Sequence, residues 1–119
     1  MATVLIVDDS PDMRALMVAI VAKSGHTVLE AADTESARRK LVENPDLIFL
    51  DVDMPQETGV AMLIRLRVSD PGFNTPVVFV TAHPERAEGL RKRSGGPVDV
   101  IAKPFRNEDI LQALRRHLS

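Results

Sequence analysis

The sequence lacks cysteine, tryptophan and tyrosine altogether, and its only aromatic side chains are four phenylalanines among 119 residues. Without cysteine there is no disulfide, no thiolate metal site and no cysteine nucleophile, which agrees with a reducing cytoplasm, the location that we expect. Because aromatic side chains supply the stacking surfaces on which single-stranded nucleic acid is bound, their scarcity argues against direct binding of nucleic acid.

Long apolar runs are missing as well. The longest, such as residues 47–50 and 77–80, are far shorter than the roughly 20 residues that a helix needs to cross a bilayer. The opening residues MATVLIVDDS contain no basic region followed by a long apolar region, so we expect neither a signal peptide nor contact with a membrane. The length suits one domain, and residues 1–119 are predicted to form a single, free-standing domain.

Short apolar runs alternate with stretches of helical periodicity along the whole chain. Strands are predicted at residues 3–7, 26–30, 46–50, 77–80 and 98–102. Helices are predicted from Pro11 to Gly25, at 34–44, 59–69 and 84–94, and at the end of the chain around Ile110, Leu111, Leu114 and Leu118. Because the strands are apolar throughout, they favour a parallel sheet covered by helices on both faces, an α/β fold of the doubly wound type.

Polar side chains stand at the ends of four predicted strands. Asp8 and Asp9 come after the first strand, Asp51 after the third, Thr81 after the fourth and Lys103 after the fifth. Ligands of doubly wound sheets bind beyond the carboxyl ends of the strands, so we expect these residues to meet at one edge. Crowded carboxylates repel one another, and a divalent cation that prefers oxygen ligands, such as Mg²⁺, relieves the repulsion. Singly, each residue has a plainer explanation, as a turn former, a helix cap, a strand residue or a solvated lysine.

Four motifs stand in order at these strand ends, namely VDD at 7–9, LDVDMP at 50–55, VTA at 80–82 and KPF at 103–105. Together they resemble the response-regulator receiver domain, and the resemblance covers essentially the whole chain. It implies a five-stranded flavodoxin-like (βα)5 fold and a signalling protein that is no enzyme beyond assisting its own phosphorylation and dephosphorylation. It also implies that a histidine kinase or phosphotransfer protein donates the phosphoryl group and that a conformational change carries the signal to a downstream protein.

The resemblance further implies a role for each acidic residue. Asp51 is the phosphoacceptor, whose carboxylate attacks the phosphoryl group to form an aspartyl phosphate. Mg²⁺ is bound directly by the side chains of Asp9 and Asp51 and by the main-chain carbonyl of Asp53. Asp8 acts mainly through a water molecule bound to the metal.

Phosphoryl oxygens need donors as well as a metal. By the same resemblance, the Thr81 hydroxyl and the Lys103 ammonium group supply them, and the peptide bond between Lys103 and Pro104 is cis. His83 and Asp53 occupy positions that border the path of the hydrolytic water in this family. Both are therefore predicted to tune the lifetime of the phosphate.

The sequence departs from the family at Val100, where receivers commonly have tyrosine or phenylalanine. That aromatic side chain swings inward when the threonine engages the phosphoryl group, and a short β-branched valine cannot make the same movement. The fourth predicted helix, 84–94, is weakly apolar, so its ordering is an alternative route for the signal. Homodimerisation through the fourth and fifth helices occurs in the family, but the polar fourth helix offers no apolar patch to support it.

Two other functions compete with phosphorylation as a signal. Asp51-Val52-Asp53 resembles the nucleophile motif of haloacid-dehalogenase-like phosphatases, but Pro55 stands where that family has threonine or valine, and the chain lacks room for a cap. The second is a docking module of receiver fold that is never phosphorylated. Such a module is expected to have lost some of the residues at the strand ends, and none is lost here.

Overall fold

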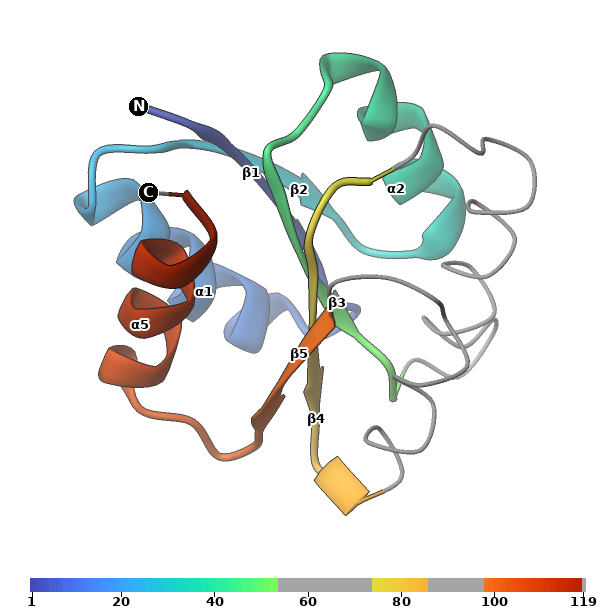
Figure 1. The fold of residues 1–119 in the computed structure, drawn as a ribbon. Coiled ribbons are helices and arrows are strands. Elements are labelled where there is room, and N and C mark those ends of the chain that lie inside the picture. Colours follow the sequence, from blue (N-terminus) through green and yellow to red (C-terminus); the bar gives the residue numbers. More distant parts are fainter. Residues whose placement is uncertain (54–73, 86–97, 119) are drawn as a thin grey trace.

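A five-stranded sheet forms the centre of the computed structural model (Figure 1), which describes residues 1–53, 74–85 and 98–118. The strands are β1 (Thr3–Val7), β2 (Thr27–Ala31), β3 (Leu47–Asp51), β4 (Val77–Thr81) and β5 (Val98–Ala102), in the order β2-β1-β3-β4-β5. Every neighbouring pair of strands is parallel. This order and direction confirm the predicted doubly wound, flavodoxin-like α/β fold.

The predicted strand bounds are correct to within one residue. β2 and β3 each begin and end one residue later than predicted, and β4 extends to Thr81. The helix predicted at 59–69 lies outside the described residues, and of the helix predicted at 84–94 only the first two residues are described.

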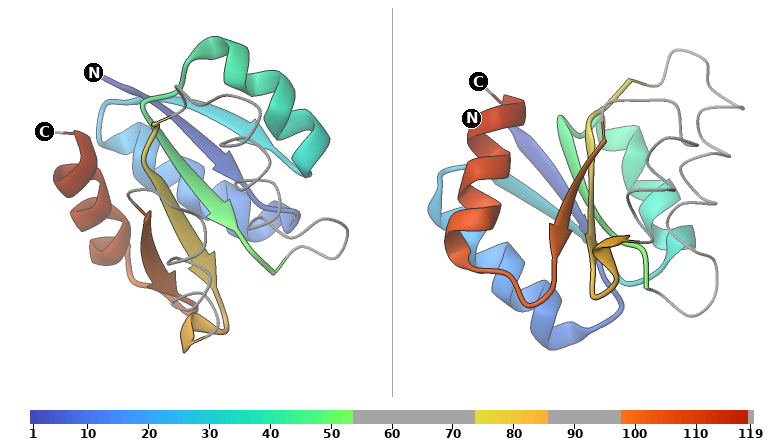
Figure 2. Two further views of the ribbon diagram at one scale, coloured as in Figure 1. Left: turned by 45° about the vertical axis from the view of Figure 1, so that its right-hand side comes forward. Right: turned by 60° about the horizontal axis from the view of Figure 1, so that its bottom comes forward.

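Helices cover both faces of the sheet. The described α-helices are α1 (Pro11–Lys23), α2 (Thr34–Lys40) and α5 (Asn107–Leu118). α1 and α5 lie side by side on one face and α2 lies on the other (Figure 1 and Figure 2). Within the described ranges, no helix combines the length and the hydrophobicity that a bilayer span requires.

Two apolar clusters fill the space on either side of the sheet. Side chains of β1 alternate between them, with Leu5 and Val7 on the α2 side and Val4 and Ile6 on the side of α1 and α5. The helices add Ala37 to the first cluster and Met17, Ile20, Val21, Ile110, Ala113 and Leu114 to the second. Because the central strands β1, β3 and β4 are buried on both faces, they are almost entirely apolar, whereas the edge strands β2 and β5 contain Glu30 and Asp99.

The α1 helix begins as predicted, because the Ser10 side chain accepts a hydrogen bond from the Met13 N–H and Pro11 occupies the first turn. Leu16, on the predicted apolar face, is 46% exposed. The buried stripe of the helix is narrower than predicted, since only Met17, Ile20 and Val21 are buried along it.

The second helix is shorter than predicted. Its α-helical part ends at Lys40 and is followed by a single 3₁₀ turn, η1 (Leu41–Glu43). Asn44 then adopts a left-handed conformation with φ of 54°. The prediction of a helix through Asn44 is wrong in its last turn, because Pro45 disfavours the helical conformation for the residue before it.

Candidate functional site

The carboxyl ends of β1 and β3 bring three carboxylates together at the edge of the sheet that lies at the bottom of Figure 1. Val7 pairs with Leu50, so Asp8 and Asp51, which follow them, are neighbours. One ligand oxygen from each of Asp8, Asp9 and Asp51 lies within 4.8 Å of the other two. The strand order reverses between β1 and β3, which is the point where doubly wound folds bind their ligands.

Asp8 is a buried carboxylate with one unsatisfied oxygen. Its side chain is held by the Ser10 N–H, which donates to Oδ1 at 2.9 Å, whereas no described residue donates to Oδ2. Burial raises the pKa of Asp8 above its ordinary value, and the neighbouring Asp51 adds to this effect. Arg14 fixes the main chain here by donating to the Asp8 carbonyl at 2.8 Å, and Arg14 is itself held by Glu30.

Asp51 is 3% exposed and lies between the acids and a cation. Its Oδ1 accepts a hydrogen bond from the Asp53 N–H at 2.8 Å, and the Lys103 Nζ lies 3.2 Å from the same oxygen. The peptide bond between Lys103 and Pro104 is cis, as the family resemblance implied. The Lys103 N–H donates to the Thr81 carbonyl at 2.7 Å, which joins the ends of β4 and β5.

The carboxylate of Asp53 accepts hydrogen bonds from two donors at the carboxyl end of β4. The Thr81 hydroxyl donates to Oδ1 of Asp53 at 2.7 Å, and the Ala82 N–H donates to Oδ2 at 2.8 Å. The Lys103 Nζ is 4.0 Å from Oδ2. Burial alone would raise the pKa of Asp53, but these donors and the cation more than offset it, and the pKa lies below its ordinary value.

Sequence reasoning assigned the main-chain carbonyl of Asp53 to the metal and placed the residue beside the path of the hydrolytic water, but it did not predict that the carboxylate accepts these two hydrogen bonds. The spacing Asp51-Val52-Asp53 was the one available signal. Within the described residues, the structure brings together every side chain that was predicted to meet at the strand ends, namely those of Asp8, Asp9, Asp51, Thr81 and Lys103.

The three clustered carboxylates fit a hard divalent cation. The unsatisfied Oδ2 of Asp8 is buried beside Asp51, and such an oxygen is costly unless a cation or a water molecule lies next to it. Asp9 is exposed and leaves the cluster open to solvent on one side. Mg²⁺ prefers oxygen ligands and retains several waters, so a half-open cluster of carboxylates suits it.

Val100 and two of the three histidines, His26 and His117, lie away from this cluster. Val100 is half-buried and packs against the apolar cluster on the α2 side of the sheet. His26 accepts a hydrogen bond from the Ala2 N–H, so it has a structural partner rather than a ligand. The His83 N–H donates to the Thr81 hydroxyl oxygen at 2.9 Å, which leaves its imidazole ring beside the site.

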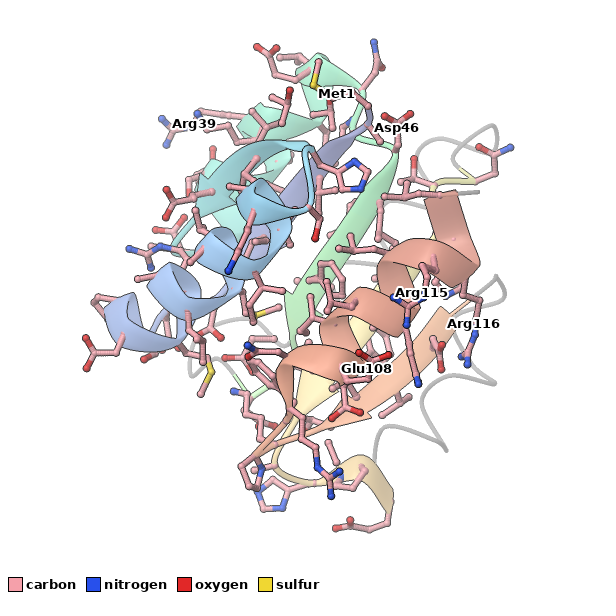
Figure 3. All side chains as sticks on the ribbon, turned by 90° about the vertical axis from the view of Figure 1, so that its left-hand side faces the viewer. Met1, Arg39, Asp46, Glu108, Arg115 and Arg116 are labelled. Carbon is pink, nitrogen blue, oxygen red and sulfur yellow. The ribbon has the colours of Figure 1, made fainter. Side chains whose placement is uncertain are left out.

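A second charged group connects α5 to β5. Arg116 of α5 pairs with Asp99, and the His117 Nε2 lies 3.5 Å from the same carboxylate, while Arg115 pairs with Glu108 along the helix (Figure 3). Burial would raise the pKa of Asp99, but the Val100 N–H and the two α5 side chains more than offset it and hold the pKa below its ordinary value. These contacts fix α5 against the edge strand.

Comparison with known proteins agrees with the fold and with the motifs. The model of the response regulator receiver domain family matches residues 4–115 of the chain. The chain belongs to this family. It is therefore a receiver domain of the two-component signalling systems.

Relatives of this receiver domain include free-standing and larger proteins. It is 31% identical to the chemotaxis protein CheY of Thermotoga maritima over 115 residues, which cover 95% of the chain and 94% of CheY. It is also 31% identical to the phosphate regulon transcriptional regulatory protein PhoB of Pseudomonas aeruginosa over 114 residues, which cover 95% of the chain and 50% of PhoB. The receiver domain spans about half the length of the first transcriptional regulators that it matches.

Solved structures agree with the observed fold. The chemotaxis protein CheY4 of Vibrio cholerae superimposes on the receiver domain with a TM-score of 0.87 at 32% identity, and the match covers 98% of both chains. The receiver domain of NtrX from Brucella abortus superimposes with a TM-score of 0.82 at 30% identity, covering 97% of both chains.

Proposed function

We propose that this receiver domain accepts a phosphoryl group on Asp51 in a Mg²⁺-dependent reaction and passes the signal to a protein partner. The observation that carries the proposal is the position of the Asp51 carboxylate. It is 3% exposed, lies within the cluster of Asp8 and Asp9, and is 3.2 Å from the Lys103 ammonium group. A buried carboxylate between a cation and further acids suits a nucleophile that must hold an anionic group.

The chain's own residues account for most of the chemistry. A carboxylate oxygen of Asp51 forms a bond to phosphorus while the bond between phosphorus and the imidazole nitrogen of a phosphohistidine donor breaks. The electron pair of that bond stays on the imidazole, which leaves, and the product is an aspartyl phosphate. Lys103, whose Nζ lies 3.2 Å from Asp51, and the Thr81 hydroxyl, which donates to Asp53 in this structure, are the groups proposed to hold two of the phosphoryl oxygens. Neither residue transfers a proton in this step, so the receiver assists its own modification mainly by positioning and by charge.

Mg²⁺ would be held by the side chains of Asp9 and Asp51 and by the Asp53 carbonyl, with Asp8 acting mainly through a metal-bound water. When bound, the ion offsets the negative charge that gathers on the phosphoryl oxygens during transfer. The raised pKa of Asp8 and its unsatisfied oxygen support the need for such an ion.

A histidine kinase or phosphotransfer protein is the proposed donor, in the cytoplasm, and a downstream protein is the proposed recipient of the signal. Position 100, where many receivers have an aromatic side chain that moves on phosphorylation, is a half-buried valine packed against the apolar cluster. Because a short β-branched side chain cannot make that movement, we propose that the signal leaves the site by another route.

Intact-mass measurement after incubation with Mg²⁺ and a small phosphodonor tests the proposal. The expected result is a mass increase of one phosphoryl group per chain that requires Mg²⁺ and is absent from Asp51→Ala. Labelling that persists in Asp51→Ala would refute the site, and no labelling under any condition would favour the docking module. Sustained turnover of small phosphate esters would instead favour a phosphatase, because a receiver transfers one phosphoryl group per Asp51 before slow hydrolysis.

A further inference from the structure

The Thr81 hydroxyl, proposed above to bind a phosphoryl oxygen, already has an acceptor in this structure, and the N–H of the next residue, Ala82, shares that acceptor. The Thr81 hydroxyl and the Ala82 N–H donate to the two different oxygens of the Asp53 carboxylate, at 2.7 and 2.8 Å. The Lys103 Nζ lies 3.2 Å from Asp51 and 4.0 Å from Asp53, so it faces both carboxylates. The Asp53 carboxylate thus accepts hydrogen bonds that the oxygens of a phosphoryl group on Asp51 could otherwise accept.

We propose that the Asp53 carboxylate is an internal competitor of the phosphoryl group, which holds Thr81 and Ala82 until Asp51 is modified and so sets the threshold for modification. The proposal rests on the proposed function of Asp51 and adds a regulatory role for the side chain of Asp53. This role differs from that of the Asp53 main-chain carbonyl, which is the proposed metal ligand and is retained when the side chain is replaced.

Competition follows from the count of hydrogen bonds. Each of Thr81 and Ala82 offers one hydrogen to this group, and both hydrogens are engaged by Asp53. For a phosphoryl oxygen to accept them, the bonds to Asp53 must break, and its carboxylate must return to solvent. Hydrogen bonds to charged groups are among the stronger ones in proteins, so their exchange has a measurable cost.

The negative charge of Asp53 also opposes the addition of a phosphoryl group to Asp51. The carboxylate of Asp53 is 28% exposed, accepts hydrogen bonds from Thr81 and Ala82, and lies 4.0 Å from the Lys103 Nζ. A phosphoryl group on Asp51 would add negative charge beside it, and like charges at close range repel. Removal of the Asp53 charge should therefore favour both the binding of a phosphoryl analogue and the transfer itself.

The test compares Asp53→Ala and Asp53→Asn with the wild-type protein at saturating Mg²⁺. Affinity for beryllofluoride, an analogue of the phosphoryl group, is measured by NMR titration, and the rate of Asp51 labelling by a small phosphodonor is measured by intact mass. We expect Asp53→Ala to bind beryllofluoride about tenfold more tightly and to be labelled severalfold faster, on the scale of one charge-assisted hydrogen bond. The gain in Asp53→Asn should be smaller, because its amide oxygen can still accept one of the two hydrogen bonds. Asp53→Asn has nearly the shape of aspartate and provides the measurement if Asp53→Ala does not fold.

A matched control separates competition from a general loss of charge. Glu85 is an exposed acid four residues after Thr81, and Glu85→Gln removes the same charge. This control should bind the analogue as the wild-type protein does. An equal gain in Glu85→Gln would overturn the proposal in favour of a general electrostatic effect.

The amide resonance of Ala82 gives a second readout, which does not depend on phosphorylation of Asp51. Without analogue it should shift in Asp53→Ala, because its acceptor is gone, and with beryllofluoride the wild-type and variant resonances should converge. An Ala82 resonance that is the same in wild-type protein and variant, or an affinity no better than that of the wild-type protein, would overturn the competitor role while labelling of Asp51 leaves the proposed function intact. If the wild-type protein and all variants remain unlabelled and bind no analogue, the proposed function and this inference fall together.

Discussion

Replacing Asp8 by asparagine should stabilise the protein when no divalent cation is present and remove most of its response to Mg²⁺. Asp8 is 1% exposed, no described residue donates to its Oδ2, and burial raises its pKa. Asparagine has nearly the same shape and retains an oxygen that can accept the hydrogen bond from the Ser10 N–H. It removes a buried negative charge beside Asp51.

The magnitude follows from the distances in the cluster. The ligand oxygens lie within 4.8 Å of one another, and two unit charges at that distance repel by about 3.5 kcal/mol at an effective dielectric constant of about 20. The Lys103 ammonium group, 3.2 Å from Asp51, offsets part of this repulsion, which leaves an expected gain of about 1–2 kcal/mol. For a domain of this size the gain corresponds to a Tm higher by about 4–8 °C.

Thermal unfolding followed by circular dichroism, with EDTA and with Mg²⁺, measures both effects. The wild-type Tm should rise with Mg²⁺, whereas that of Asp8→Asn should start higher and change little. Because the pKa of Asp8 is raised in the folded state, the stability linked to its proton is present below the unfolded pKa of about 3.9 and is lost as the pH rises through the folded pKa. The advantage of the variant should therefore appear only at the higher pH.

The control for this experiment is Asp46→Asn, which removes a charge at the opposite end of β3 (Figure 3). It should leave the response to Mg²⁺ unchanged. A lower Tm for Asp8→Asn in EDTA would refute the reasoning about buried charge, and an unchanged response to Mg²⁺ would remove Asp8 from the metal site.

Three further substitutions test other parts of the account. Lys103→Met, which removes the ammonium group beside Asp51, should slow labelling of Asp51 at least tenfold by intact mass, and an unchanged rate would exclude Lys103 from the transfer. Asp99→Asn should lower the Tm at neutral pH by the equivalent of about 1 kcal/mol. The lowered pKa of Asp99 means that its contribution is present above the unfolded pKa and lost as the pH falls through the folded pKa, so the two melting curves should converge in acid and a constant difference would contradict this. His83→Ala should change the half-life of the phosphorylated protein severalfold in a mass time course after removal of the donor, and an unchanged half-life would separate the His83 ring from the path of water.

The sheet and the carboxylate cluster were predictable because both follow from strand register. Apolar strands of a parallel sheet align their carboxyl ends, so residues that follow the strands, such as Asp8 and Asp51, meet wherever β1 and β3 pair. The end of α2 was less predictable, although Pro45 gave a local signal against a helical Asn44.

Side-chain direction beyond a strand end was not predictable from spacing. Asp53 lies in a turn, where the main-chain conformation decides whether the carboxylate faces solvent or the donors on Thr81 and Ala82. Likewise, periodicity placed Leu16 on the apolar face of α1, but the width of the contact with the sheet decides which residues along that face are buried, and Leu16 remains 46% exposed. Both outcomes depend on tertiary packing, which a linear pattern does not contain.

Chemical mapping of the modified residue tests the central claim most directly. After phosphorylation with Mg²⁺ and a small donor, borohydride reduction converts an aspartyl phosphate to homoserine, and peptide fragmentation locates the product. The account predicts homoserine at position 51 and unmodified aspartate at positions 8, 9 and 53. Homoserine at any of those three positions, or phosphate recovered on a residue other than aspartate, would contradict it.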